Sequence, residues 1–329
     1  DHSQGRLRSA ARSRSNVRVV AAGTDAPNGD DLGTDDVSSV GPALRGQERR
    51  PYDVTAERGM SRPGRDVSAA VTTGLAMAVV FVFAYLIGTG ALLALASVAL
   101  VGCAVEAFSM LQRAGFRPAT LVGALGTLGA VLAAYWKGPG ALGLVMALVV
   151  GASLLWYLAK VVEARPVVNA AVTTLAFTWV GIMGSFAGVL LAMPSGSRLF
   201  VGAVVPTVIA DMAAWFAGSR FGSHQMAPTV SPGKTWEGFF AGAVAAVVVG
   251  AVIGGALAPW TLTRGIVLGL MIAVVAPVGD LVQSMVKRDL RLKDSGALLP
   301  GHGGLLDRFD SVLFALPATY CLVTVLHIA

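Results

Sequence analysis

The chain has 329 residues, of which 55% are hydrophobic and 13% charged, and its mean hydropathy is +0.69. A soluble globular domain has about 25% charged residues, so the composition excludes a typical water-soluble protein and indicates an integral membrane protein. The net charge is +6, and eleven of the 25 lysines and arginines precede residue 66. Basic residues beside apolar segments set topology and attract anionic headgroups, so we expect membrane lipids as partners and no nucleic acid.

Residues 1–66 are rich in Arg, Ser, Gly, Asp and Pro and have almost no aromatic residues. Such a segment buries too little apolar surface to offset its conformational entropy, so a disordered polar tail is predicted. The basic start is not followed by an apolar core at the distance typical of a signal peptide, which argues against a cleaved signal.

Nine apolar segments follow the tail, each near the roughly 20 residues that a membrane span needs. Most are rich in Gly, Ala and Val, and such small residues favour close helix packing in membranes. We therefore expect an all-α polytopic membrane protein in which residues 67–329 form one multi-helix catalytic domain. The predicted spans are 67–88, 90–111, 118–136, 140–160, 169–192, 198–218, 237–257, 264–287 and 307–328.

The distribution of basic residues predicts the orientation of the spans. If the N-terminal tail is cytoplasmic, the inside loops and their flanks carry eleven lysines and arginines, and the outside connections carry three. Positive charge is retained on the cytoplasmic side, so the N-terminus is expected inside and the C-terminus outside. Two long polar loops, residues 211–238 and 280–310, would then face the cytoplasm.

The first polar loop begins with Asp211, a carboxylate well inside a predicted span. A charge there is costly and marks a site more often than not. The loop continues as SPGKTWEG, where Ser231, Lys234 and Thr235 precede the next predicted helix. Two interpretations stay open: phosphate binding at this helix N-terminus, or a helix cap by Ser231 or Thr235 beside a lysine that extends to the membrane surface.

The second polar loop places polar side chains on one helix face. Asp280, Ser284, Lys287 and Arg291 are spaced by 4, 3 and 4 residues, which is the helical repeat. They form a stripe of a carboxylate, a hydroxyl and two cations at the end of the eighth predicted span.

Asp307 and Asp310 lie three residues apart at the start of the last span, and the glycine-rich PGHGG turn precedes them. This turn allows the two helix ends to meet, and convergent carboxylates suit Mg²⁺, which binds oxygen ligands together with substrate phosphate. Nearby lysines and arginines would hold the remaining phosphate charge. The pattern indicates phosphoryl or nucleotidyl transfer to a lipid.

A simpler interpretation is an ion-pair network at the membrane edge. It accounts for Arg288, Arg291 and Arg308 but not for the three aspartates or the glycine turn. His302 alone is more often a turn residue than a catalyst.

The second loop also carries a long motif. It begins with Ser, two residues and Lys-Arg, and Lys-Asp follows four residues later. A small residue and an apolar-Pro pair then lead into His-Gly-Gly, and the motif ends with Asp-Arg-apolar-Asp. Here the sequence resembles the bacterial phosphatidate cytidylyltransferase (CDP-diacylglycerol synthase) family, over about residues 67–329. Two departures fall in the first loop, Trp215 where tyrosine is common and Gly233 where lysine is common. The matching residues are Ser284, Lys287, Arg288, Lys293, Asp294, Gly296, Leu299, Pro300, His302, Gly303, Gly304, Asp307, Arg308 and Asp310.

The resemblance implies a homodimeric enzyme of the cell membrane that converts CTP and phosphatidate to CDP-diacylglycerol and pyrophosphate at the cytoplasmic face. It implies a Mg²⁺ centre, with K⁺, on Asp280 and Asp307, supported by Asp310, while Ser284 and Lys287 act on substrate phosphates. The other candidate substrate-binding residues are Arg288, Lys293, Asp294, His302, Arg308, Asp211, Ser231, Lys234 and Thr235.

Two alternatives to this activity are a CTP-dependent polyprenol or lipid kinase and, from a different class, a membrane transporter. A transporter predicts paired halves with interrupted helices, and the sequence has no such repeat.

Overall fold

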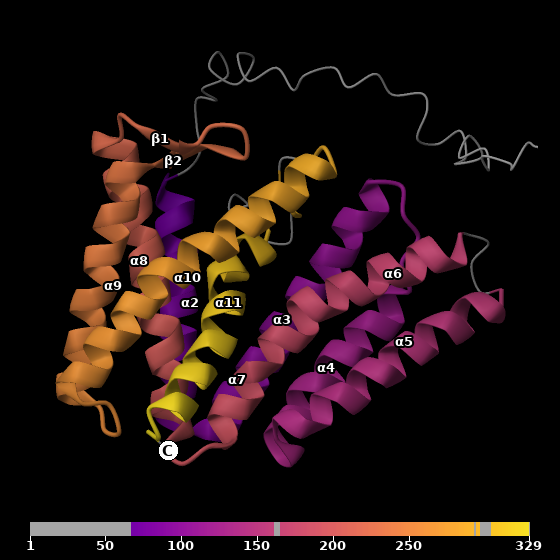
Figure 1. Cartoon of the computed structure of the whole chain (residues 1–329), viewed down its shortest axis with the longest axis horizontal. Coiled ribbons are helices and arrows are strands. Elements are labelled where there is room, and N and C mark those ends of the chain that lie inside the picture. Colours follow the sequence, from indigo (N-terminus) through magenta and orange to yellow (C-terminus); the bar gives the residue numbers. More distant parts are fainter. Residues whose placement is uncertain (1–66, 161–164, 293, 297–303, 329) are drawn as a thin grey trace, which may run out of the picture. The chain divides into compact units, whose positions relative to one another are not determined.

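The computed structural model of the chain describes residues 67–160, 165–292, 294–296 and 304–328. The disordered tail predicted for residues 1–66 lies outside them. The described residues form helices and one two-stranded antiparallel sheet (Figure 1). The helices are α2 (Val67–Ile87), α3 (Thr89–Arg113), α4 (Thr120–Lys137), α5 (Leu142–Leu158), α6 (Pro166–Ala176), α7 (Met183–Ala192), α8 (Gly196–Phe221), α9 (Trp236–Ala256), α10 (Leu262–Asp289) and α11 (Leu306–Val325); the strands are β1 (Gln225–Ala227) and β2 (Ser231–Thr235). A 3-10 turn, Pro139–Ala141, precedes α5, and a π-helical segment, Phe177–Ile182, joins α6 to α7.

The nine apolar segments predicted from the sequence each coincide with a helix. In the described residues, eight helical segments are long and apolar enough to cross a membrane, and a shorter apolar helix, Gly74–Ile87, falls in the first predicted span. One of the eight, Pro166–Ala192, consists of α6, the π-helical segment and α7. The all-α, multi-pass fold class is therefore confirmed, with helix ends that differ from the predicted ends by a few residues.

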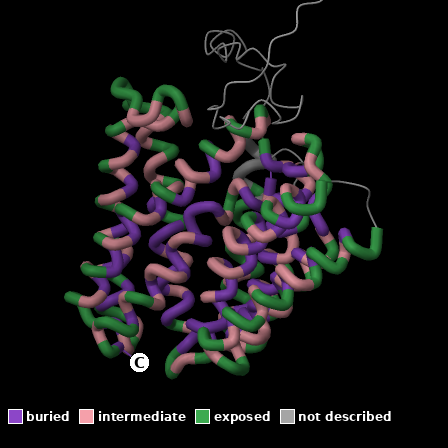
Figure 2. The backbone as a smooth tube through the Cα atoms, turned by 45° about the vertical axis from the view of Figure 1, so that its right-hand side comes forward, coloured by how far each residue is buried: buried purple, intermediate pink, exposed green. Residues whose placement is uncertain are grey.

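Helices α8 to α11 pack against one another and carry both polar loops. α9 packs on α8 and on α10, and α11 lies against α10 and α8. Figure 1 shows the β1–β2 hairpin where α8 ends and α9 begins, on the side of the bundle where α10 ends and α11 begins. In Figure 2 the buried stretches follow the sides of the helices that face their neighbours, and the exposed stretches follow the outer sides.

Glycines bring the backbones of α9 and α10 into direct contact. A β-carbon on Gly250 would lie 2.3 Å from the carbonyl oxygen of Gly265, and one on Gly265 would lie 2.1 Å from that of Gly250. A β-carbon on Gly254 or Gly269 would likewise lie 2.4 or 2.5 Å from a carbonyl oxygen of the facing segment. Small residues permit this approach, because packing rather than the hydrophobic effect holds helices together in lipid. The contact fixes α10, and with it Asp280, against α9.

Gly250→Ala is expected to destabilise the protein by about 1–3 kcal/mol, because the added methyl group meets backbone that has no room to move aside. Gly255→Ala, on the same helix, is the matched control, since nothing lies within 4 Å of its β-carbon position. Thermal unfolding of the purified variants in detergent measures the difference. Equal unfolding midpoints would contradict the close contact.

Candidate functional site

Three of the four residues of the polar stripe predicted from the sequence, Asp280, Ser284 and Lys287, lie on α10. The fourth, Arg291, is not on this helix, because α10 ends at Asp289 and the backbone of Arg291 is left-handed (φ 57°). Ser284 Oγ donates a hydrogen bond to Asp280 Oδ1 at 3.5 Å, as expected for side chains one turn apart. Lys287 Nζ, on the same face, forms an ion pair with Asp307 Oδ1 at 2.9 Å. The end of α10 and the start of α11 therefore meet, as the sequence predicts.

Asp307 accepts four hydrogen bonds. Its Oδ1 accepts from Lys287 Nζ at 2.9 Å and from Gln283 Nε2 at 2.6 Å. Its Oδ2 accepts from the backbone N–H groups of Ser295 at 3.3 Å and Gly304 at 3.1 Å. The side chain is 17% exposed, so these bonds replace most of its hydration and fix its orientation.

The hairpin forms a second wall of the site. Lys234 Nζ lies 2.8 Å from Asp280 Oδ2 and donates to the Pro277 carbonyl oxygen at 3.4 Å. Arg288 Nε, on α10, donates to the Val230 carbonyl oxygen at 3.3 Å. One lysine and one arginine thus join the hairpin to α10.

The cap interpretation of the first loop holds for Thr235. Its Oγ1 accepts a hydrogen bond from the Gly238 backbone N–H at 3.2 Å, which caps the N-terminus of α9. Ser231 lies half-buried at the start of β2. Lys234 turns toward Asp280 instead of extending to the membrane surface.

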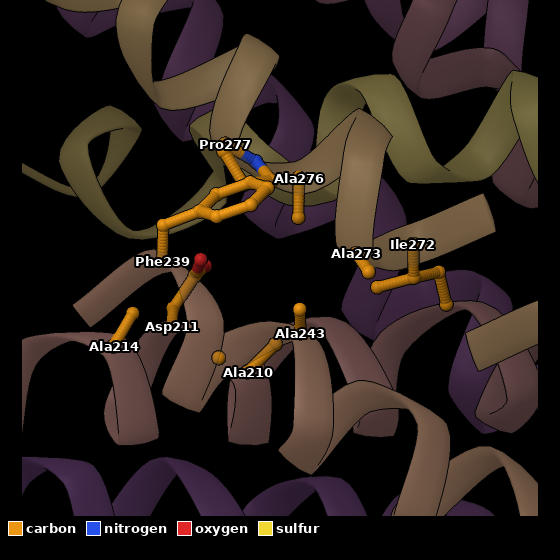
Figure 3. Close-up of a pocket in the computed structure, with 10 residues that line it drawn as sticks. Ala210, Asp211, Ala214, Phe239, Ala243, Ile272, Ala273, Ala276 and Pro277 are labelled. Atoms are coloured by element: carbon orange, nitrogen blue, oxygen red, sulfur yellow. The ribbon is translucent and has the colours of Figure 1, made fainter. Parts of the chain in front are cut away.

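Two further aspartates approach Asp280 from neighbouring helices. Asp310, on α11, is 7% exposed and accepts from the Ser311 backbone N–H at 2.8 Å. Its carboxylate lies near enough to Asp280 and Asp211 for electrostatic repulsion. Figure 3 shows Asp211, on α8, in a small crevice, with its carboxylate directed toward Phe239 and Pro277. Three helices therefore each contribute an aspartate to this part of the bundle.

Within the described ranges, no three carboxylate, histidine or cysteine side chains lie close enough together to hold one ion. Asp307 instead contacts Lys287, while Asp310 interacts electrostatically with the carboxylates of Asp280 and Asp211. The predicted ligand set of Asp280, Asp307 and Asp310 stays a prediction. Mg²⁺ commonly uses only one or two carboxylates and fills its other positions with water and phosphate.

The remaining predicted residues lie at the edge of this cluster or outside the described part of the chain. Arg308, on α11, is exposed. Asp294 is exposed, and its backbone carbonyl accepts from Arg113 at 3.4 Å. Lys293 and His302 lie outside the described residues, so their predicted roles are untested.

Two polar residues of the site were missed by sequence reasoning. Gln283 is fully buried on α10 and donates to Asp307, and its position four residues before Lys287 would have placed it beside the stripe. Glu106, on α3, is 2% exposed and accepts from the Leu306 backbone N–H at 2.7 Å. It is a charge inside an apolar span, the same signal that identified Asp211.

Fold and site together define a multi-pass membrane enzyme whose carboxylates and lysines converge where α8, α10 and α11 meet the hairpin. Residues 68–326 match the model of the cytidylyltransferase family, and the chain belongs to this family. It is 31% identical over 309 residues to a phosphatidate cytidylyltransferase of Mycobacterium bovis, an alignment that covers 89% of this chain and 99% of the relative. The resemblance found in the sequence motif is therefore confirmed.

Proteins of the same name from other bacteria match shorter parts of the chain. The Mycobacterium leprae protein is 36% identical over 162 residues, 48% of this chain and 51% of the relative. The Brucella suis protein is 44% identical over 113 residues, 33% of this chain and 41% of the relative.

Proposed function

We propose that the protein transfers CMP from CTP to phosphatidate, forming CDP-diacylglycerol and pyrophosphate for phospholipid biosynthesis. The observation that carries this proposal is that residues of both polar loops converge into one cluster: Lys287 contacts Asp307, and Lys234 contacts Asp280. The relatives that match most of the chain bear the name of this activity.

The reaction brings two anions together. A phosphate oxygen of phosphatidate attacks the α-phosphorus of CTP, the bond from this phosphorus to the oxygen that bridges to the β-phosphate breaks, and pyrophosphate leaves. Positioning and neutralisation of charge dominate the catalysis of such a step. Lys234 and Lys287 are the cations for it: their side chains are 18% and 17% exposed, and aspartates hold both in place.

The proposal includes Mg²⁺, and K⁺ beside it, held by Asp280, Asp307 and Asp310. The residues fit such an ion by their chemistry: the carboxylates are hard oxygen donors. Asp310 is buried beside two further carboxylates, whose repulsion a cation would relieve. When bound, Mg²⁺ would neutralise phosphate charge on the nucleotide and on the leaving pyrophosphate.

The proposal also places the site at the cytoplasmic face of the cell membrane. Support comes from the eleven basic residues in and beside the predicted inside loops against three outside. CTP is a soluble nucleotide, and a site at the helix ends is accessible to it from water. Phosphatidate would enter from the lipid at the side of the bundle. The homodimer implied by the resemblance stays a prediction.

Asp307→Asn is expected to lower CMP transfer by at least about 100-fold, because it removes a charge that orients Lys287 and that the reaction centre needs. The assay supplies labelled CTP and phosphatidate in detergent and measures lipid-linked CMP and pyrophosphate. Asp289→Asn is the matched control, an exposed carboxylate on α10 outside the cluster. Full activity of purified, folded Asp307→Asn protein would refute the assignment of this residue. Release of CDP in place of pyrophosphate would instead identify a lipid kinase. Movement of lipid across the membrane without conversion of substrate would identify a transporter.

Removal of divalent cations with EDTA is expected to reduce CMP transfer to background, and Mg²⁺ added in excess is expected to restore it. K⁺ alone should not restore CMP transfer, since a monovalent ion neutralises less phosphate charge. The unfolding midpoint, followed in the same samples, separates loss of the cofactor from loss of fold. Undiminished transfer in EDTA would contradict a role for Mg²⁺.

The orientation predicts which single cysteines a membrane-impermeant maleimide labels in intact cells. Gly233→Cys, in the hairpin, should react only after the cells are broken, whereas Gly140→Cys, at the opposite end of the bundle, should react in intact cells. Both positions are exposed and have nothing within 4 Å of the β-carbon. A Cys321→Ser background removes the exposed native thiol. The reverse labelling pattern would overturn the cytoplasmic placement.

A further inference from the structure

A buried glutamate from α3 caps the first turn of α11. Glu106 is 2% exposed, and its Oε2 accepts a hydrogen bond from the backbone N–H of Leu306, the first residue of α11, at 2.7 Å. No residue of α11 itself provides a side-chain cap at this end. The first backbone N–H groups of a helix lack internal partners and carry partial positive charge, so a carboxylate from another helix satisfies both needs.

The other oxygen of Glu106 fills space that two glycines leave open. A β-carbon on Gly296 would lie 1.8 Å from Glu106 Oε1, and one on Gly304 would lie 2.6 Å from it. Arg113, further along α3, also donates to the backbone carbonyl of Ser295. The chain on both sides of residues 297–303 therefore rests against α3.

These backbone positions supply two of the hydrogen bonds to Asp307. The N–H groups of Ser295 and Gly304 both donate to its Oδ2. A displacement of either segment, or of the first turn of α11, would change where the Asp307 carboxylate points relative to Lys287. Glu106 accepts a hydrogen bond from Leu306 in the first turn of α11, and it lies beside Gly304 and beside Gly296, the residue after Ser295.

We propose that Glu106 is a positioning residue for CMP transfer, which holds the start of α11 and the flanking glycines so that Asp307 keeps its orientation. The inference rests on the proposed function for the chemistry that Asp307 performs. It assigns a role to a residue outside both polar loops, and it gives a physical reason for glycine at position 296, where a β-carbon would meet Glu106.

Loss of the carboxylate is expected to act on the rate of transfer more than on nucleotide binding. Glu106→Ala should lower kcat by about 10- to 100-fold, as is typical when a group that orients a catalytic or metal-binding side chain is removed. The KM for CTP should change by less than about 3-fold, since the lysines remain. Glu106→Gln retains an oxygen that accepts from the Leu306 N–H, so it should recover most of the kcat.

Ser97→Ala is the matched control on the same helix. Ser97 is a buried polar residue of α3 whose hydroxyl donates only to the Leu93 carbonyl of its own helix. Its loss should leave kcat unchanged, which separates a general effect on α3 from the specific effect of Glu106.

A double-mutant cycle with Gly296 tests the geometry directly. The three atoms nearest to a β-carbon on Gly296 all belong to Glu106. Gly296→Ala should therefore lower kcat by a similar factor in the wild-type background and add little in the Glu106→Ala background. Such non-additivity is the signature of two residues in contact.

The experiment measures kcat and KM for CMP transfer by these variants, together with hydrogen exchange in peptides covering residues 304–310. Lower kcat, faster exchange at the start of α11 in Glu106→Ala, and recovery in Glu106→Gln are the expected results. Unchanged kcat in Glu106→Ala, a loss of thermal stability without a change in kcat, or additive effects in the cycle would overturn the inference. If the wild-type protein transfers no CMP, the proposed function fails, and unchanged exchange in Glu106→Ala would then overturn the anchoring role separately.

Discussion

The carboxylate of Asp307 connects parts of the chain that are otherwise separate. Its oxygens accept hydrogen bonds from Lys287 and Gln283 on α10 and from the backbone N–H groups of Ser295 and Gly304. A carboxylate that is mostly withdrawn from water requires these partners, since each unfilled bond at a buried polar group costs about 1–3 kcal/mol. The end of α10, the chain before α11 and α11 itself are therefore constrained together by one side chain.

Small residues make this convergence possible within a membrane bundle. Where Gly250 and Gly265 meet, the backbones of α9 and α10 touch, so no bulky side chain separates the helices that carry the site. On the next interface, a β-carbon on Gly279 would lie 2.5 Å from the Asp310 carbonyl oxygen, which places α10 equally close to α11. Polar side chains from neighbouring helices then reach one another over the short distances that ion pairs need.

Sequence patterns predict the local features of this structure and miss the long-range contacts. The nine spans could be predicted because apolar runs are a local property, and the stripe from Asp280 to Lys287 follows from helical periodicity. The contact between Glu106 and Leu306 joins residues 200 positions apart, and no periodicity reports it. The motif likewise identifies Asp307 and Asp310, and helical spacing identifies Asp280, but neither predicts the directions of these side chains. Only the packing of α10 on α11 turns Asp307 toward Lys287 and leaves Asp310 beside the other carboxylates.

The two lysine–aspartate pairs also bear on how the proposed reaction is controlled. Lys234 and Lys287 each neutralise one aspartate, so the charges within these two pairs are compensated at the membrane edge. In the proposed reaction, a triphosphate that draws the lysines away would expose Asp280 and Asp307, and a cation on these carboxylates would offset that change. Nucleotide and cation would then stabilise each other's binding through the same four side chains.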